Sequence, residues 1–138
     1  MVYKIHRYTQ AGGRSDVQET YDSGSAERRA ELDVALEYLK CRDRGEWRRP
    51  KAAKLSKTQG YRDYFEIRFM ADQVQQRPIG YFGPESGVFT ILLWATEKGG
   101  TLRPADWYDK AERRRARIES GTDQSIPLQQ HGENADAE

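Results

Sequence analysis

The sequence predicts one α+β domain, in which an antiparallel sheet packs against an N-terminal helix or helical hairpin and a C-terminal helix follows. Three observations predict this fold class. Apolar residues recur at helical spacing after residue 25, three apolar-aromatic runs lie between residues 64 and 95, and a second helical pattern covers residues 105–118. A chain of 138 residues is within the usual length of a single domain.

The N-terminal part predicts a strand, a loop and a helix. Residues 2–8 alternate β-branched and aromatic side chains with polar ones, which is typical of a strand. Residues 10–24 are rich in glycine and polar residues and predict a loop. Leu32, Leu36 and Leu39 then share one helical face, and Ser25 is a suitable N-cap, so a helix begins there.

The centre of the chain predicts three consecutive strands. Residues 64–70 and 74–82 are short apolar-aromatic runs, and Pro78 and Gly80 indicate a bulge, a bend or an edge in the second. Residues 88–95 are almost continuously apolar, which is typical of a central strand that is buried on both faces. Because the connecting turns are short, we expect an antiparallel meander.

The C-terminal part predicts a helix over residues 105–118, with Trp107, Ala111 and Ile118 facing the core. The chain that follows contains mainly Gly, Ser, Gln, Asn and acidic residues and has little to bury. We therefore expect a folded domain over residues 1–119 and an acidic, disordered tail over residues 120–138.

The charge is unevenly distributed. The formal net charge is +1, but residues 121–138 carry four acidic and no basic side chains, which leaves 23 basic against 18 acidic residues elsewhere. Residues 40–62 alone carry nine basic and two acidic side chains, and residues 47–57, predicted as a short helical piece broken at Pro50, supply most of them. Such a field favours a polyanion or an acidic protein as partner, whereas the alternative is a solvated basic face.

Several classes of function find no support in the sequence. With Cys41 as its single cysteine the chain can form no internal disulfide, which fits a reducing cytoplasm. Only two histidines are present, His6 and His131, and no glycine-rich phosphate loop occurs, so we expect no metal and no cofactor. We expect no leader, no stretch is long and apolar enough to span a membrane, and we therefore expect a cytoplasmic protein without a membrane partner.

The residues left to carry chemistry are cationic and aromatic. Their types can bind a phosphodiester, stack a base and stabilise the charge that builds on phosphorus when a ribose 2′-OH attacks it. They are Lys54, Lys57, Tyr64, Arg77, Tyr81 and Lys98. The alternative is structural, with Arg68 paired to Glu66 or to an acidic residue of the first helix and Arg77 solvated.

Residues 50–118 resemble the RelE/ParE toxin superfamily, in particular its HigB-like, phage Gp49-like branch. The motifs are Lys54-Leu55 ahead of a "Phe-Glu-Ile-Arg-Phe" strand, an "Arg-Pro-Ile-Gly-Tyr-Phe" strand, an apolar strand ending in "Glu-Lys-Gly-Gly", and a C-terminal helix with three consecutive arginines. The resemblance covers half of the chain. It implies a RelE-like fold with a curved antiparallel sheet.

The resemblance also implies a function. Many members of this superfamily are toxins of type II toxin-antitoxin systems that cut messenger RNA in the ribosomal A site without a metal, leaving a 2′,3′-cyclic phosphate. By resemblance, Arg77 stabilises the charge on the phosphate, Lys98 holds or protonates the leaving side, and Tyr81 stacks a base. The general base has no candidate. The RNA backbone is expected to bind five basic residues, Arg48, Arg49, Lys51, Lys54 and Lys57.

The implied partners are a cognate helix-turn-helix antitoxin, the ribosome and messenger RNA. An alternative is a non-catalytic binding protein with the RelE/ParE fold, either a ParE-like topoisomerase inhibitor or a phage interaction protein. The absence of a general base favours this alternative. A third reading is a decayed, inactive copy of such a toxin.

Overall fold

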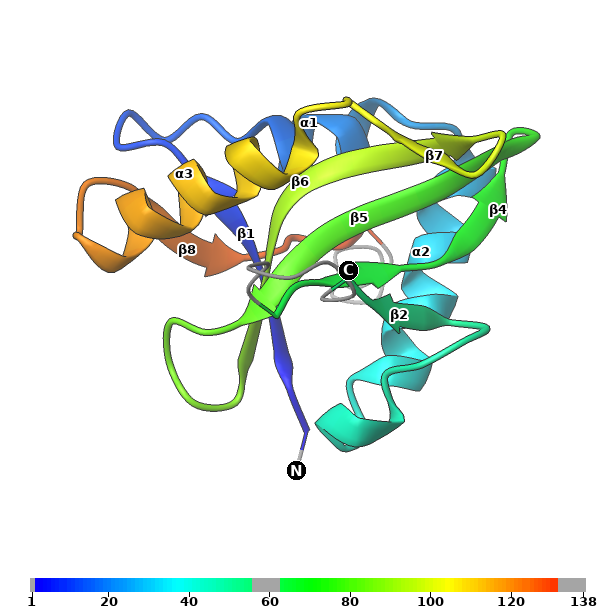
Figure 1. Cartoon of the computed structure of the whole chain (residues 1–138), viewed down its shortest axis with the longest axis horizontal. Coiled ribbons are helices and arrows are strands. Elements are labelled where there is room, and N and C mark those ends of the chain that lie inside the picture. The colour runs from blue at the N-terminus through cyan, green and yellow to red at the C-terminus, as the bar shows by residue number, and fades with distance from the viewer. Residues whose placement is uncertain (1, 56–62, 132–138) are drawn as a thin grey trace.

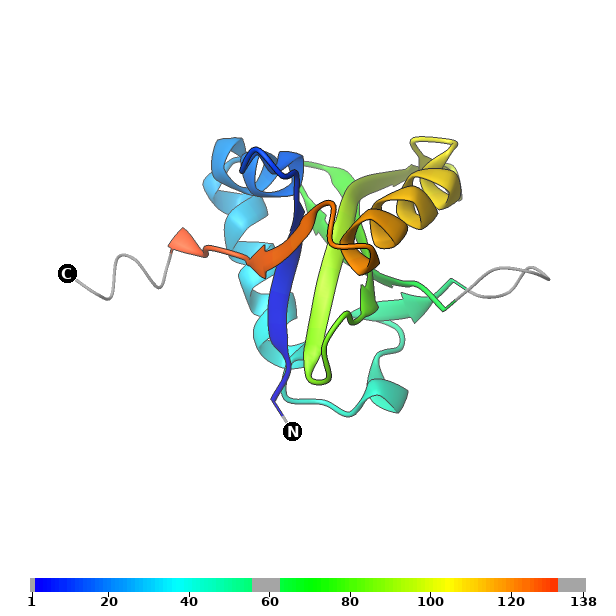
Figure 2. The same ribbon diagram turned by 90° about the vertical axis from the view of Figure 1, so that its left-hand side faces the viewer.

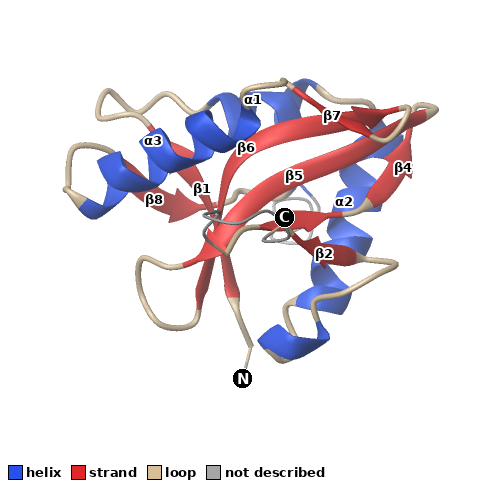
Figure 3. Cartoon of the chain, viewed as in Figure 1, coloured by secondary structure: helices blue, strands red, loops and turns tan. Residues whose placement is uncertain are grey.

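A computed structural model describes residues 2–55 and 63–131. Over these residues the fold is α+β, as the sequence predicts, with a sheet between two layers of helix (Figures 1 and 3). The helices are α1 (Asp16–Ser23), α2 (Ala26–Leu39) and α3 (Trp107–Glu119), with a short 3-10 helix, η1 (Arg44–Glu46). The strands are β1 (Lys4–Thr9), β2 (Ala52–Lys54), β3 (Phe65–Ile67), β4 (Phe69–Ala71), β5 (Val74–Phe82), β6 (Val88–Lys98), β7 (Thr101–Arg103) and β8 (Gln124–Pro127).

The sheet is mixed rather than antiparallel throughout. Its order is β2-β3-β5-β6-β1-β8, with β4 also paired to β5 and β7 to β6. The predicted meander is confirmed, because β3, β5 and β6 pair antiparallel in sequence. However, β1 lies parallel to β6, so the expectation of a purely antiparallel sheet is wrong. A helical connection after β1 allows this, since α1 and α2 cross one face of the sheet before the meander begins.

The N-terminal segment holds a helix that the sequence did not predict. Where residues 10–24 were expected to form a loop, Ser15 caps α1 by accepting the N–H of Gln18 at 3.2 Å. Val17 and Tyr21, four residues apart, are both buried. The following helix, α2, begins after Ser25 as predicted, because the Ser25 hydroxyl accepts the N–H of Arg28 at 3.0 Å. The N-terminal unit is therefore a helical pair.

The region before the meander differs from its prediction. Instead of a helical piece over residues 47–57, the chain forms η1 and then β2, which pairs antiparallel with β3. The strand predicted over residues 64–70 is divided into β3 and β4 at Arg68, which lies between them. Pairing to the sheet decides the first difference, because β2 gains a partner strand that a short helix interrupted by Pro50 would lack.

Two separate cores lie on the two faces of the sheet. One is formed with α1 and α2 and contains Leu32, Leu36, Trp47, Ile67 and Phe89 among others. The other lies under α3 and contains Tyr64, Ile79, Tyr81, Leu92 and Ala111 among others. Figure 2 shows the helical pair and α3 on opposite sides of the strands. Because both faces are covered, the central residues of β5 and β6 are buried, as the apolar run of residues 88–95 predicts for β6.

The C-terminal segment continues the fold, which corrects the expected boundary of the domain. Residues 120–138 were predicted to be a disordered tail, but β8 pairs antiparallel with β1. Asp123 is buried and accepts hydrogen bonds from the Tyr8 hydroxyl, from the N–H of Ala11 at 3.0 Å and from Arg117 at 2.6 Å. Leu128 joins the core under the helical pair. The domain therefore extends past residue 119, and residues 132–138 lie outside the described part.

Candidate nucleic-acid interface

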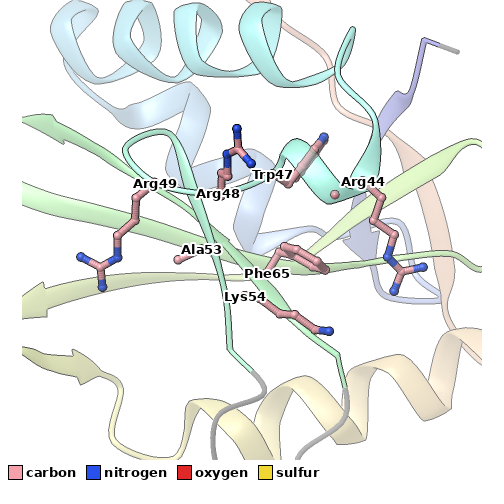
Figure 4. A pocket seen from close by; sticks show the side chains of 8 residues that line it. Arg44, Trp47, Arg48, Arg49, Ala53, Lys54 and Phe65 are labelled. Atoms are coloured by element: carbon pink, nitrogen blue, oxygen red, sulfur yellow. The ribbon is translucent and has the colours of Figure 1, made fainter.

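A basic hollow of about 570 Å³ opens where η1 passes over the edge of the sheet. The η1 turn and the residues after it supply one side, and β2 and β3 supply the other, with Lys54 paired in register to Phe65. The hollow is lined by Arg44, Gly45, Trp47, Arg48, Arg49, Ala53, Lys54 and Phe65, and Figure 4 displays these side chains. We call this feature the basic hollow.

Two aromatic rings of the core form the floor of the basic hollow. Trp47 and Phe65 are 2% and 4% exposed, and their ring centroids lie 6.3 Å apart in an edge-to-face arrangement. The Trp47 indole Nε1 donates to the carbonyl oxygen of Arg42 at 3.3 Å, which fixes the ring. The floor is therefore rigid and apolar, and the charged groups stand around it.

Four cations surround this floor, and none of the described lining residues is acidic. Figure 4 shows Arg44 on one side of the hollow and Arg49 on the other, with Trp47 and Phe65 between them. Arg44 also lies over the rings of Phe82 and Phe65, at 4.8 and 5.8 Å from their centroids. Among the residues that the structure describes, Arg48 has no ion-pair partner, and the same holds for Arg49. Within the described part of the chain the charges of Arg48 and Arg49 are thus uncompensated, whereas Arg44 and Lys54 lie 3.8 and 3.5 Å from the Asp63 carboxylate.

A second, smaller hollow of about 330 Å³ adjoins the basic hollow and shares Arg44 with it. Its other described lining residues are Asp63, Tyr81, Phe82 and Arg115. The Arg115 guanidinium lies 4.5 Å from the centroid of the Tyr81 ring. We call this feature the Arg115 hollow. Arg115 belongs to α3, so the two hollows together extend from the edge of the sheet to this helix.

Tyr64 lies next to Arg115 and is held by α3. Its hydroxyl donates to Glu112, and the Arg115 guanidinium lies 5.7 Å from its ring centroid. Burial, and then the hydrogen bond to the Glu112 carboxylate, raise the pKa of Tyr64 well above the usual value for tyrosine. Tyr64 is therefore a neutral hydrogen-bond donor at physiological pH and not a base.

Arg77, the predicted catalytic arginine, lies inside the fold. Its side chain is 3% exposed, and its Nε donates to Glu97 Oε1 at 2.9 Å. Its other nitrogens donate to the carbonyl oxygen of Gln76 at 2.8 Å and to the side chain of Gln75. Every nitrogen of the guanidinium thus has a protein acceptor, and this arrangement gives no support to a role for Arg77 in holding an RNA phosphate.

Arg68 belongs to the same buried network. The alternative interpretation of the sequence was right to pair it with Glu66 but wrong to expect Arg77 in solvent. The Arg68 guanidinium donates to Glu66, and it lies 3.8 Å from Glu97 Oε1. Glu66 in turn lies 3.8 Å from Arg77 Nε. Two arginines and two glutamates therefore neutralise one another between β3, β5 and β6, which makes the network a structural element of the sheet.

The three residues predicted to be catalytic are not brought together. Tyr81 is 2% exposed and lines the Arg115 hollow. Lys98 is exposed at the end of β6 and lines a different hollow of about 620 Å³, between the β4–β5 and β6–β7 hairpins. That hollow has no described lining residue in common with the basic hollow. With Arg77 buried, the arrangement contains no assembled catalytic trio.

The residues predicted to bind RNA agree better with the structure. Arg48, Arg49 and Lys54 all line the basic hollow. Lys51 is half-buried, and its carbonyl oxygen accepts the N–H of Arg68 at 2.8 Å, so it supports β3 rather than lining the hollow. Lys57 lies outside the described residues.

Sequence reasoning missed several residues that line the two hollows. Trp47 stands between Glu46 and two arginines, and an aromatic ring within a basic run is a recognisable signal for nucleic-acid binding. Arg44 belongs to the same basic run. Phe65 was expected only as part of the strand over residues 64–70. Arg115 belongs to the three consecutive arginines of the family motif, but it is remote from the basic run in sequence and comes close only through the packing of α3.

Over the residues described, no helix is long and apolar enough to cross a membrane. Within the same part of the chain, no three His, Cys, Asp or Glu side chains lie close enough to hold a metal ion. Cys41 is exposed and forms no disulfide.

Comparisons of the chain with protein-family models, with curated proteins and with solved structures found no match. The resemblance to the RelE/ParE superfamily therefore remains an expectation from the sequence.

Proposed function

We propose that this protein binds single-stranded RNA through the basic hollow. The observation that carries the proposal is the arrangement of Arg44, Arg48, Arg49 and Lys54 around the rings of Trp47 and Phe65. Arginine side chains hold phosphate oxygens in a bidentate manner. The two rings are buried and fix the part of the chain that carries these cations. No carboxylate among the described lining residues opposes a polyanion there.

We further propose, on the sequence resemblance, that the chain is the toxin of a type II toxin-antitoxin pair. Its RNA would be messenger RNA in the ribosome, and its inhibitor a small helix-turn-helix antitoxin. An open reading frame for such a protein beside this gene would support the assignment. An isolated gene would count against it.

The proposed RNA-binding protein could either cleave RNA or bind it without cleavage, and the geometry favours binding alone. Ribonuclease chemistry without a metal needs a base for the 2′-OH and a cation at the phosphate. Arg77 is occupied by Glu97, and Lys98 lines another hollow, so neither stands beside the basic hollow. The geometry therefore favours a non-catalytic RelE/ParE-fold protein over an endoribonuclease, and primer extension on transcripts after induction distinguishes the two. New ends within translated codons support cleavage, and their absence supports binding alone.

A charge-reversal experiment tests the interface itself. The variant Arg48→Glu/Arg49→Glu should lose most of its affinity for a fluorescein-labelled oligouridine, measured by fluorescence anisotropy at low salt. Arg103→Glu/Arg113→Glu is a matched control, because it makes the same change of net charge at two exposed positions that do not line the basic hollow. Equal losses in the two variants would mean that the basic hollow is not the binding site.

A further inference from the structure

Asp63 stands between the two hollows and contacts cations of the basic hollow. Its Oδ2 lies 3.8 Å from Arg44 Nη2, and its Oδ1 lies 3.5 Å from Lys54 Nζ. Asp63 itself lines the Arg115 hollow, on the other side of Arg44. One carboxylate therefore bridges the two cations that separate the hollows.

This bridge is weak compared with the ion pairs inside the sheet. All three side chains are about half exposed, at 50%, 51% and 48% for Arg44, Lys54 and Asp63. In contrast, the Arg77–Glu97 contact is 2.9 Å, and Arg77 is almost fully covered. Exposed ion pairs at such long distances contribute little to stability, because water screens them. The cations beside Asp63 are thus held near one another but remain available to a stronger anion.

The Arg115 hollow offers a second cation on the far side of Asp63. Arg115 lies over Tyr81, and among the described residues its carboxylate contact is with Glu119 of the same helix, at 3.3 Å. Because the hollows share Arg44, an extended polyanion that lies in the basic hollow can continue past Arg44 toward Arg115. On that path its phosphate would take the position that Asp63 occupies between Arg44 and Lys54.

We propose that Asp63 is an intramolecular competitor for phosphate, and that the Arg115 hollow is a second phosphodiester subsite reached when RNA displaces this carboxylate from Arg44 and Lys54. This inference rests on the proposed RNA binding at the basic hollow. It adds a residue that regulates RNA binding, Asp63, and a path for the bound RNA from the basic hollow to the Arg115 hollow. It also accounts for an acidic residue at the centre of an otherwise basic surface.

Removal of the competing charge tests the proposal. Asp63→Asn should bind the labelled oligouridine about two- to five-fold more tightly than the wild type, the range expected for release of an exposed ion pair. Glu31→Gln is the matched control, because it removes one negative charge from an exposed position on α2. The control should change the dissociation constant by less than Asp63→Asn does. Equal affinities for the two variants, or weaker binding by Asp63→Asn, would overturn the proposal.

A variant without Arg44 and Lys54 tests whether the gain in RNA affinity comes from the contacts of Asp63 with these two cations. In Arg44→Ala/Lys54→Ala, Asp63 has lost its contacts with both cations, so Asp63→Asn should no longer increase affinity. A gain of the same size in that background would overturn the competitor role. Arg115→Ala should weaken binding, while Arg113→Ala, an exposed arginine of the same helix outside the Arg115 hollow, should have a smaller effect. Equal effects of the two helix variants would overturn the second subsite.

The two levels of the proposal fail in different ways. If the Arg48→Glu/Arg49→Glu variant binds RNA as well as its control does, the proposed function fails. If that variant loses binding but Asp63→Asn behaves as Glu31→Gln does, only the competitor role fails. Circular dichroism melts of each variant confirm folding, and Asp63→Ser, which also removes the charge, should reproduce the gain. If Asp63→Ser did not increase the affinity for RNA, the explanation by loss of the Asp63 charge would be wrong.

Discussion

Arg77 of β5 and Glu97 of β6 form a buried ion pair, with Nε of the arginine 2.9 Å from Oε1 of the glutamate. The pair is diagonal across the two longest strands, because Arg77 is opposite Ala95 and Glu97 is opposite Gln75 in the register. Glu66 and Arg68 extend it to β3. The charge of Arg77 therefore connects strands of the sheet and is not directed to solvent.

Arg77→Ala should destabilise the protein by about 3–5 kcal/mol, because it leaves the carboxylates of Glu66 and Glu97 with one arginine fewer in a covered site. Urea unfolding followed by circular dichroism measures this cost. Arg103→Ala, at an exposed position of β7, should change the free energy of unfolding by no more than about 0.5 kcal/mol. If Arg77→Ala were as stable as this control and lost RNA binding, the arginine would have a functional role after all.

Gly80 sets the bulge that places Tyr81 and Phe82 beside the Arg115 hollow. The register of β5 against β6 shifts between Ile79 and Gly80, as the sequence predicted from Pro78 and Gly80. A Cβ at Gly80 would overlap the carbonyl oxygen of Thr90 and lie 2.9 Å from the Phe89 ring. Neither backbone nor buried ring can move freely, so only glycine fits at this position.

Gly80→Ala should therefore lower the free energy of unfolding by about 3 kcal/mol, at the upper end of the usual cost of overpacking. Gly12→Ala is the control, since a Cβ there meets nothing within 4 Å and its backbone needs no left-handed conformation. Both values come from urea titration. An equally small effect of both substitutions would show that β5 can shift to accommodate the methyl group.

The elements that the sequence predicted are those determined by local patterns. The leucine spacing and the Ser25 cap fix α2, and the continuous apolar run fixes β6. In contrast, β8 was missed because its pairing to β1 joins residues more than one hundred positions apart. A short polar segment such as residues 124–127 carries no signal of its own. Contacts distant in sequence, rather than local propensity, place it in the sheet.

The candidate site follows the same division. Arg48, Arg49 and Lys54 were predictable because they belong to one basic run. The burial of Arg77 was not, because its partner Glu97 is twenty residues away and approaches only through the register of β5 and β6. A sequence motif gives the type of a side chain but not whether a carboxylate elsewhere in the chain already occupies it.

The salt dependence of RNA binding should show how many cations of the basic hollow contact phosphates. If Arg44, Arg48, Arg49 and Lys54 each contact a phosphate of single-stranded RNA, the logarithm of the binding constant should fall with the logarithm of salt concentration at a slope of about −3. Arg48→Ala/Arg49→Ala should reduce the steepness by about 1.4. Anisotropy titrations over a salt series measure both slopes. A slope unchanged by the double substitution would place the phosphates elsewhere.

Asp123 should make the fold sensitive to acid. The hydrogen bond from Arg117, followed by the one from Tyr8, holds the pKa of this carboxyl below its usual value of 3.8. Because the folded-state pKa is lower than the unfolded-state pKa, the carboxylate stabilises the fold fully above the unfolded-state value. This stabilisation is lost as the pH falls from about 3.8 through the folded-state pKa, since the unfolded chain then binds more protons.

Asp123→Asn should remove this part of the pH dependence. At neutral pH the variant should be less stable than the wild type by about 2 kcal/mol, because charge-assisted bonds from Arg117 and Tyr8 are weakened. The difference should shrink as the pH falls below the usual aspartate value, where the wild type also loses the charge. Urea unfolding at a series of pH values measures it, with Asp106→Asn as a control whose carboxylate forms no cap hydrogen bond. A difference that stays constant down to the lowest pH would mean that the attachment of β8 does not depend on the ionised carboxylate.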